Sequence, residues 1–414
     1  MEPDSSQSSQ QLMSDYSQSL QTSIQIHKEN AKQRIEQCVL GIIDSILENR
    51  YPTIIRPRML TSAKEMKKAA QNPNLNTKIT FGGRSSKSFT MQVYLMSIVY
   101  RMIQQNQNST IRDLFYESMT FFGNQNRLVQ ALRELSSFLK VPREALCVEA
   151  SAKGLVAGSI TFRNPNGEVV QALDSRHGMI VPSKLHELTI TTNARCVLFV
   201  EKDAIFQRLL DERIFDVLGP IIMITGKGYP DMQTRRLMSI LNRIYHLKVY
   251  ALVDCDPYGI EIAAVVKWGS YINSNAVGDD AWTCDLSVPD LVWLGLLPSE
   301  VSSLALTLNA SAELTDRDKK KLESVHARIQ LYEQDQNQWL QEVNLLKELG
   351  RKTELEALFT SSMFTTRVYL PSKLLPVLAH RDNSNTYTVR PMSHQRTGSV
   401  ASSSARSRSS LNFA

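Results

Sequence analysis

Three acidic residues lie at the ends of two apolar runs that have the character of β-strands. Glu201 closes the run that begins at Cys196, and Asp254 and Asp256 follow the run that begins at Val249. The carboxyl ends of parallel strands meet at one edge of a sheet, so we expect the three carboxylates to converge there. Their oxygens suit Mg²⁺, which keeps waters and takes substrate phosphate as a further ligand. In the alternative reading each carboxylate is the N-cap of the helix that follows it.

A tyrosine upstream of these carboxylates is the candidate nucleophile. Tyr116 follows Arg112 by four residues, so both side chains would lie on one face of a helix. A phenol has an ordinary pKa of about 10, and a guanidinium beside it would lower that pKa or stabilise a pentavalent phosphate. Most of the 13 tyrosines are expected to pack or hydrogen-bond. Tyr116 is a candidate nucleophile because the chain also contains carboxylates that suit a metal ion. Together they indicate an enzyme that cuts DNA by attaching itself to it.

Two loops have the composition of phosphate-contacting segments. The loop 225–231 contains two glycines, which let the backbone approach a phosphate, and Lys227, which supplies charge. It is not a Walker A loop, because Lys227 is followed by Gly228. No ATP-binding motif is found elsewhere, so a process that needs ATP would take its site from another chain. The loop 151–158 carries Lys153 and is either a DNA-backbone contact or a solvated turn.

The elements around these residues fall into two patterns. Strands at 196–201, 221–225 and 249–254 alternate with helices at 203–218, 231–246 and 259–269, which predicts a parallel sheet covered by helices. Upstream, helices at 88–103, 109–117 and 125–140 precede alternating runs at 145–150, 155–163 and 168–173. Three helices followed by a hairpin are typical of a winged helix, although a generic α+β domain has the same order.

The two ends of the chain are expected to be disordered. Residues 1–30 are rich in Ser and Gln, and residues 386–414 are rich in Ser and Arg. Residues 31–49 predict an amphipathic helix, which would bury its apolar stripe against its own domain or against a partner chain. The basic linker that follows, to residue 87, is a solvated loop or a DNA-backbone contact.

Composition excludes several classes of protein. The chain has 414 residues, a formal net charge of +6 and a pI of 8.9, which is compatible with nucleic-acid binding. The five cysteines form no Cys-x-x-Cys pair, so neither a zinc site nor a disulfide framework is indicated. No run of ~18 apolar residues predicts a membrane span, and the polar N-terminus does not resemble a signal peptide. We expect an intracellular protein.

Five collinear blocks resemble the signature motifs of the type IIB topoisomerase A-subunit family. They are the segments 112–116, 151–158, 200–203, 225–231 and 254–259. The eukaryotic branch of this family makes the DNA double-strand breaks of meiotic recombination, and the Ser-rich tails suit that branch. The resemblance implies an α/β protein with a winged-helix domain at 88–185 and a Toprim domain, a Rossmann-like parallel sheet, at 186–385.

The resemblance also implies roles for individual residues. Tyr116 would attack a DNA phosphate and become linked to the 5′ end, with Arg112 one turn before it; the residue beside it is Phe115, so the choice of tyrosine is unambiguous. The Toprim acidic positions, which would hold Mg²⁺, match Glu201, Asp254 and Asp256. Positions near the DNA match Lys153, Lys227 and Tyr229.

The same resemblance implies partners and a location. One tyrosine cuts one strand, so we expect a homodimer acting on double-stranded DNA in the nucleus, on chromosomes. Meiotic accessory proteins and a topoisomerase VI B-like subunit are the expected partners, with the helix at 31–49 as the docking candidate. The alternatives are a topoisomerase VI-type enzyme that reseals its breaks, a Toprim nuclease that uses metal-bound water, or an inactive DNA-binding scaffold.

Overall fold

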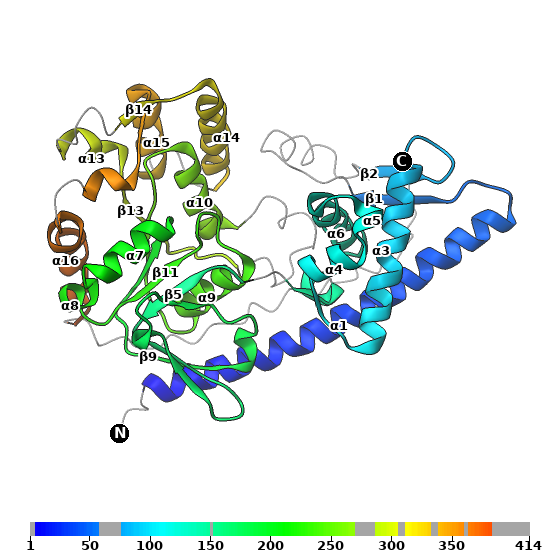
Figure 1. Ribbon diagram of the computed structural model, residues 1–414, viewed down its shortest axis with the longest axis horizontal. Coiled ribbons are helices and arrows are strands. Elements are labelled where there is room, and N and C mark those ends of the chain that lie inside the picture. The colour runs from blue at the N-terminus through cyan, green and yellow to red at the C-terminus, as the bar shows by residue number, and fades with distance from the viewer. Residues whose placement is uncertain are drawn as a thin grey trace, which may run out of the picture.

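The computed structural model describes residues 5–57, 76–149, 152–269, 286–304, 311–332, 338–359 and 363–382. The described chain forms two bodies, each with its own hydrophobic core, and a long helix runs along both (Figure 1). The first core is drawn from residues 31–148, and the second from residues 155–378 together with Met13. The expected tail at 386–414 and the first lysines of the basic linker lie outside the described residues.

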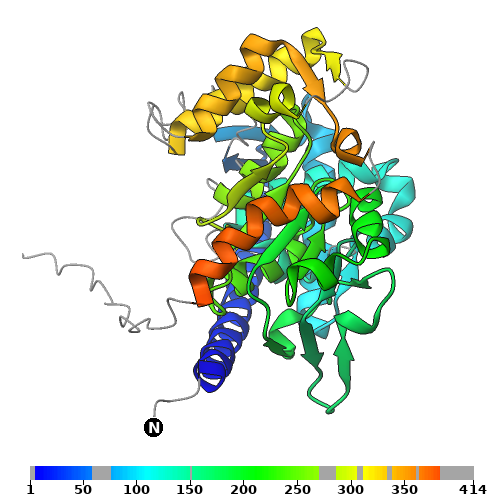
Figure 2. The same ribbon diagram turned by 90° about the vertical axis from the view of Figure 1, so that its left-hand side faces the viewer.

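The long helix corrects the prediction of a disordered N-terminus. Helix α1 (Ser5–Leu47) begins within the segment 1–30 that composition predicts to be disordered. Met13 and Leu20 are buried and Tyr16 packs against the second core, while Ile35 enters the first core. Met13, Tyr16 and Leu20 are spaced as a helical stripe that polar composition conceals, and the stripe is stabilised by a surface distant in the sequence. Figure 2 shows this helix foreshortened, with its N-terminal end at the lower left.

The first body contains the three helices that the sequence predicts. They are α3 (Ser86–Gln105), α4 (Ile111–Glu117) and α6 (Gln125–Leu139), with a short α5 (Met119–Phe122) between the last two. Thr110 and Asn124 begin α4 and α6 by accepting hydrogen bonds from backbone N–H groups of the first turn. Strands β1 (Thr53–Pro57) and β2 (Asn76–Thr80) form an antiparallel pair beside α6 and α3, and the two-residue strands β3 (Ser109–Thr110) and β4 (Val148–Glu149) pair in parallel.

The run predicted at 155–163 is divided between two sheets. Strand β5 (Leu155–Gly158) pairs with a strand of the second body, whereas β6 (Ile160–Arg163) forms a hairpin with β7 (Val169–Gln171) and also pairs with β9 (Thr189–Thr192). Gly158 has a φ of +103°, which turns the chain between the two halves. The first core ends at Val148 and the second, apart from Met13, begins at Leu155, while the domain boundary at 185 and the winged helix stay predictions.

The second body is built on a six-stranded sheet in the order β13-β12-β10-β11-β5-β8. The strands β10 (Val197–Val200), β11 (Ile222–Thr225) and β12 (Val249–Leu252) are parallel, as the sequence predicts, and β13 (Val292–Gly295) adds a fourth parallel strand that it did not predict. Strand β5 runs antiparallel to β11 and pairs with β8 (Met179–Ile180). The connecting helices are α7 (Asp203–Asp211), α8 (Ile214–Leu218), α9 (Met232–Arg243) and α10 (Pro257–Trp268). The predicted helix 203–218 is broken at Arg213, which has a φ of +55°.

The C-terminal elements return to the carboxyl edge of this sheet. After α13 (Pro298–Ser303) and β14 (Ser311–Glu313), helix α14 (Asp316–Tyr332) packs against α10, followed by α15 (Gln338–Leu349), β15 (Arg351–Thr353) and the 3-10 helix η5 (Leu355–Phe359). The π-helical turn η6 (Thr365–Tyr369) leads into α16 (Leu370–Asp382). Among the described helices, none combines the length and apolarity needed to cross a bilayer.

Candidate active site

Glu201 and Asp254 lie at the same edge of the sheet, as the sequence predicts. They follow β10 and β12, which are adjacent parallel strands with Val200 paired to Leu252. The Glu201 Oε2 accepts a hydrogen bond of 2.9 Å from the backbone N–H of Asp254. Both carboxylates are buried, with 8% and 5% of the residue exposed. The parallel register therefore brings two residues that are 53 apart in the sequence into direct contact.

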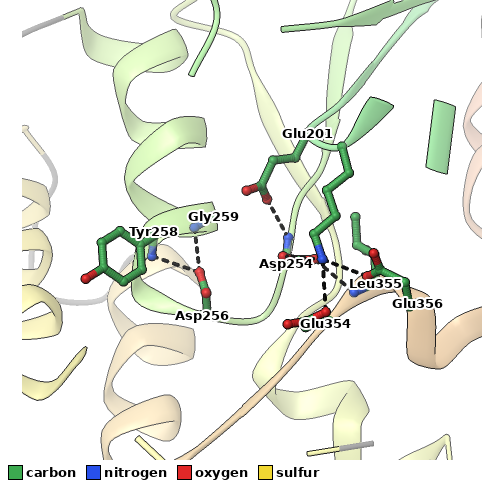
Figure 3. A network of polar contacts seen from close by, with 9 residues as sticks. Glu201, Asp254, Asp256, Tyr258, Gly259, Glu354, Leu355 and Glu356 are labelled. Atoms are coloured by element: carbon green, nitrogen blue, oxygen red, sulfur yellow. Dashed lines mark hydrogen bonds and ion pairs between the residues drawn. The ribbon is translucent and has the colours of Figure 1, made fainter. Parts of the chain in front are cut away.

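A lysine that the sequence analysis overlooked occupies the other side of Asp254. The Lys202 Nζ lies 3.0 Å from Asp254 Oδ2, and it also pairs with Glu354 at 3.2 Å and Glu356 at 2.7 Å. The Asp254 Oδ1 accepts a 2.9 Å hydrogen bond from the Leu355 N–H. Figure 3 shows Glu354, Leu355 and Glu356 gathered on this side of Asp254. The adjacency of Lys202 to Glu201 was a usable signal in the sequence.

Asp256 adopts the N-cap role that the sequence left open for all three carboxylates. Its Oδ1 accepts hydrogen bonds from the N–H groups of Tyr258 at 2.8 Å and Gly259 at 2.7 Å, which begins α10. In Figure 3 these bonds hold Asp256 toward α10, while Glu201 and Asp254 contact each other. The expected convergence is thus incomplete: within the described residues, no three His, Cys, Asp or Glu side chains are grouped as a metal site.

Burial gives these carboxylates unusual electrostatics. Burial, and then repulsion from Asp254, raises the pKa of Glu201 to about 8, and burial also raises the pKa of Asp254 to about 6 against the opposing effect of Lys202. The pKa of Asp256 is raised by burial as well, although its two amide hydrogen bonds favour the charged form. Glu201 and Asp254 are buried and repel each other, Lys202 is the ion-pair partner of Asp254, and the carboxylate oxygens are hard ligands. The residues present therefore fit a divalent cation such as Mg²⁺.

A distant segment holds the acidic motif in place. Cys255, between the two aspartates, forms an antiparallel bridge with Thr353, with N–H···O distances of 3.0 and 3.1 Å in the two directions. Leu355, which bonds Asp254, is 101 residues away from it in the sequence. No local pattern points to this pairing, which explains why the sequence analysis did not find it.

The loop 225–231 lies against the same edge. Its Gly228 N–H donates to the Glu201 carbonyl at 2.9 Å, and the Lys227 Nζ pairs with Asp203 at 3.1 Å. Asp231 begins α9 and also accepts hydrogen bonds from the N–H groups of Lys153, at 2.9 Å, and Gly154, at 3.2 Å. The two loops that the sequence singled out are therefore joined, and the exposed Lys153 side chain lies on the loop beside Asp231.

Tyr229 belongs to this loop, and its hydroxyl already has a partner. It donates to Glu261 of α10, which also pairs with Lys321 of α14. Burial and this hydrogen bond raise the pKa of Tyr229 well above the ordinary value for a phenol. The residue remains 43% exposed, so its ring is accessible while its hydroxyl is held.

Tyr116 lies in the other body. Helix α4 is anchored by the fully buried Leu114 and leaves Tyr116 62% exposed, with Arg112 exposed on the same helix. Figure 1 shows α4 beside α6 and α3, whereas β11 and α10 belong to the other body. Within one described chain, the candidate nucleophile and the candidate metal ligands therefore lie on elements that pack into different hydrophobic cores.

Comparison with known proteins identifies both bodies. A family model described as "Type IIB DNA topoisomerase" matches residues 87–148, and the model of the Toprim domain shared by the topoisomerase 6 A-subunit and Spo11 matches residues 196–374. The chain is 38% identical to the meiotic recombination protein SPO11 of Mus musculus over 293 residues, 70% of this chain and 72% of the mouse protein.

Two plant proteins extend the comparison. Identity to meiotic recombination protein SPO11-1 of Arabidopsis thaliana is 31% over 360 residues, 83% of this chain and 95% of that one. Identity to the A-subunit of DNA topoisomerase 6 from the same plant is 30%, covering 70% of this chain and 66% of that one. The fold and its strand-end carboxylates thus define a topoisomerase-like DNA-cleaving enzyme of type IIB. The chain belongs to the family of Spo11 and the topoisomerase 6 A-subunit, which confirms the resemblance found in the motifs.

Proposed function

We propose that this protein makes DNA double-strand breaks that initiate meiotic recombination. The phenolic oxygen of Tyr116 loses its proton and forms a bond to a backbone phosphorus, the bond from that phosphorus to the 3′ oxygen breaks, and the 3′ oxygen takes up a proton and leaves as a hydroxyl. The product is a 5′-phosphotyrosyl link, so the phosphodiester energy is conserved. The observation that carries this proposal is the exposed Tyr116 on an anchored helix, in a chain whose relatives are named meiotic recombination proteins.

Glu201, Asp254 and Asp256 are the proposed ligands of Mg²⁺. Bound there, Mg²⁺ would stabilise negative charge that develops on the reacting phosphate. The support is the burial of Glu201 and Asp254 at adjacent strand ends and the raised pKa values that burial produces. Arg112, one turn before Tyr116, is proposed to assist the attack by pairing with the phosphate.

A homodimer completes the proposed site. Tyr116 and the carboxylates lie on elements that pack into separate cores of one chain, which favours an arrangement in which the tyrosine of one protomer meets the carboxylates of the other. Two tyrosines are also needed to cut two strands. Double-stranded DNA would contact the predicted winged helix at 88–185 and the loops that carry Lys153, Lys227 and Tyr229.

The second half of α1 is the proposed docking surface for a topoisomerase VI B-like subunit. Ile35 is buried in the first core, but several apolar residues toward the end of the helix are 39% to 76% exposed; these are Val39, Leu40, Ile43, Ile46 and Leu47. An unburied apolar stripe on a helix is typical of a partner-binding face. Meiotic accessory proteins, and a location on chromosomes in the nucleus, belong to the same proposal.

Recovery of covalent protein–DNA complexes tests this function. The protein is immunoprecipitated from meiotic cells under denaturing conditions, and free 3′ DNA ends in the precipitate are labelled. We expect label with the wild type and with Tyr51→Phe, an exposed control, and none with Tyr116→Phe. Label that persists in Tyr116→Phe would contradict the assignment of the nucleophile. DNA cut without protein attached would favour a nuclease, and resealed DNA of altered linking number would favour a topoisomerase that closes its breaks.

A further inference from the structure

Lys202 forms ion pairs with three carboxylates, whereas an ordinary surface ion pair has one. Its Nζ lies within 3.2 Å of Asp254, Glu354 and Glu356, and its side chain is 26% exposed. The three partners differ, because the Asp254 side chain is 7% exposed whereas those of Glu354 and Glu356 are 71% and 50% exposed. The ammonium therefore joins a buried carboxylate at the strand edge to two solvated carboxylates at the start of η5.

The position of this ammonium conflicts with a metal ion on Asp254. A buried carboxylate needs a positive partner, and Lys202 supplies one at 3.0 Å from Oδ2. Mg²⁺ binds carboxylate oxygens at about 2.0–2.1 Å, so the two cations would repel each other strongly if both stayed on this carboxylate. Glu354 and Glu356 already contact the lysine and would keep it paired after it leaves Asp254.

We propose that Lys202 is a positioning residue that serves as an internal counter-cation for the metal site. In the metal-free protein it neutralises Asp254 and keeps the acidic motif folded, and when Mg²⁺ binds it is transferred to Glu354 and Glu356. This inference rests on the proposed function, because it takes Asp254 as a ligand of Mg²⁺. Lys202 thereby lowers the affinity for the metal and preserves the geometry of the empty site.

Metal binding by the full-length protein tests the proposal without any measurement of cleavage. Mg²⁺ is titrated calorimetrically into protein freed of metal with EDTA, and thermal unfolding is measured with and without Mg²⁺. Lys202→Met is expected to bind Mg²⁺ about tenfold more tightly than the wild type, because the competing cation is gone. Without metal, Lys202→Met should melt at a lower temperature than the wild type, and added Mg²⁺ should raise its melting temperature by more. Lys202→Arg, which keeps the charge, is expected to bind like the wild type.

A double-mutant cycle tests the role of the two glutamates. Glu354→Gln with Glu356→Gln is expected to weaken Mg²⁺ binding by about tenfold when Lys202 is present, and to have little effect in the Lys202→Met background. Lys184→Met, which removes an exposed ion pair with Glu187, serves as the matched control and should leave binding unchanged.

The outcomes separate this proposal from the function on which it rests. Equal Mg²⁺ affinity in the wild type and Lys202→Met, or weaker binding in the variant, would overturn the role of Lys202 while leaving the metal site standing. Absence of Mg²⁺ binding in both proteins would overturn the role of Lys202 together with the proposed metal site. Additive effects in the cycle would overturn the transfer to Glu354 and Glu356.

Discussion

Replacement of Glu201 by glutamine is expected to stabilise the metal-free protein at high pH. The folded state holds a proton on Glu201 up to about pH 8, whereas the unfolded chain releases it near the ordinary pKa of 4.5. Between these values the folded state binds more protons than the unfolded state, so stability falls as pH rises. Glutamine carries no charge and escapes this loss. Its side-chain oxygen can still accept the hydrogen bond from the Asp254 N–H.

The size of the effect follows from the same pKa values. Each tenfold change in proton affinity corresponds to about 1.4 kcal/mol, so a pKa moved from 4.5 to about 8 sets a ceiling of about 5 kcal/mol. Repulsion from Asp254 contributes part of that change, and Asp254 itself titrates near pH 6, so we expect about 2 kcal/mol at pH 8. For a body of this size that difference raises the melting temperature by roughly 4–8 °C.

Thermal unfolding in EDTA between pH 5 and pH 9 measures this difference. The melting temperatures of Glu201→Gln and the wild type should coincide at the acidic end and separate as pH rises toward 8. Glu313→Gln, at an exposed position on β14, is the control and should follow the wild type throughout. The reasoning is refuted if Glu201→Gln melts no higher than the wild type at pH 8, or if the difference does not depend on pH. Added Mg²⁺ should stabilise the wild type more than the variant, because the variant lacks a ligand.

Three further changes probe the supports of the site. In Gly259→Ala the new Cβ would lie 2.4 Å from the Asp254 carbonyl and 3.0 Å from Glu201 Oε2, so α10 must shift; we expect a loss of about 1–3 kcal/mol in thermal unfolding and weaker Mg²⁺ binding in calorimetry. Thr110→Ala removes the N-cap of α4 and should cost about 1 kcal/mol and lower the yield of labelled complexes, with serine at this position restoring both. Met13→Asp places a charge in the second core and should speed hydrogen exchange in the first turns of α1, while α3 keeps its protection.

Much of the candidate site followed from local sequence. Apolar four-residue strands alternating with amphipathic helices predict parallel strands, and parallel strands bring Glu201 and Asp254 to one edge. The helix predicted at 109–117 carries Tyr116, and it begins at Thr110 because a hydroxyl there satisfies a free N–H of the first turn. These predictions held because the information lies within a few residues of each site.

Other predictions were wrong or incomplete where contacts distant in the sequence decide the outcome. The polar N-terminal segment is helical because Met13 enters, and Tyr16 packs against, a core formed by residues far along the chain. Strand β5 joins the large sheet, where its four residues are all buried, although the sequence predicted the run 155–163 as part of a hairpin. Asp256 caps α10 through its Oδ1, a role that its own sequence left open.

The sequence by itself determined the types of the chemical groups and the strand ends at which they occur. Residue periodicity specifies strands and helices, and the collinear motifs specify the family. Only the tertiary structure decided that Asp254 contacts Lys202 and Leu355. It also decided that Cys255, between the two aspartates, pairs with the backbone of Thr353. The physical reason is that burial and backbone pairing depend on segments about a hundred residues apart, and these set the charge balance that no local pattern encodes.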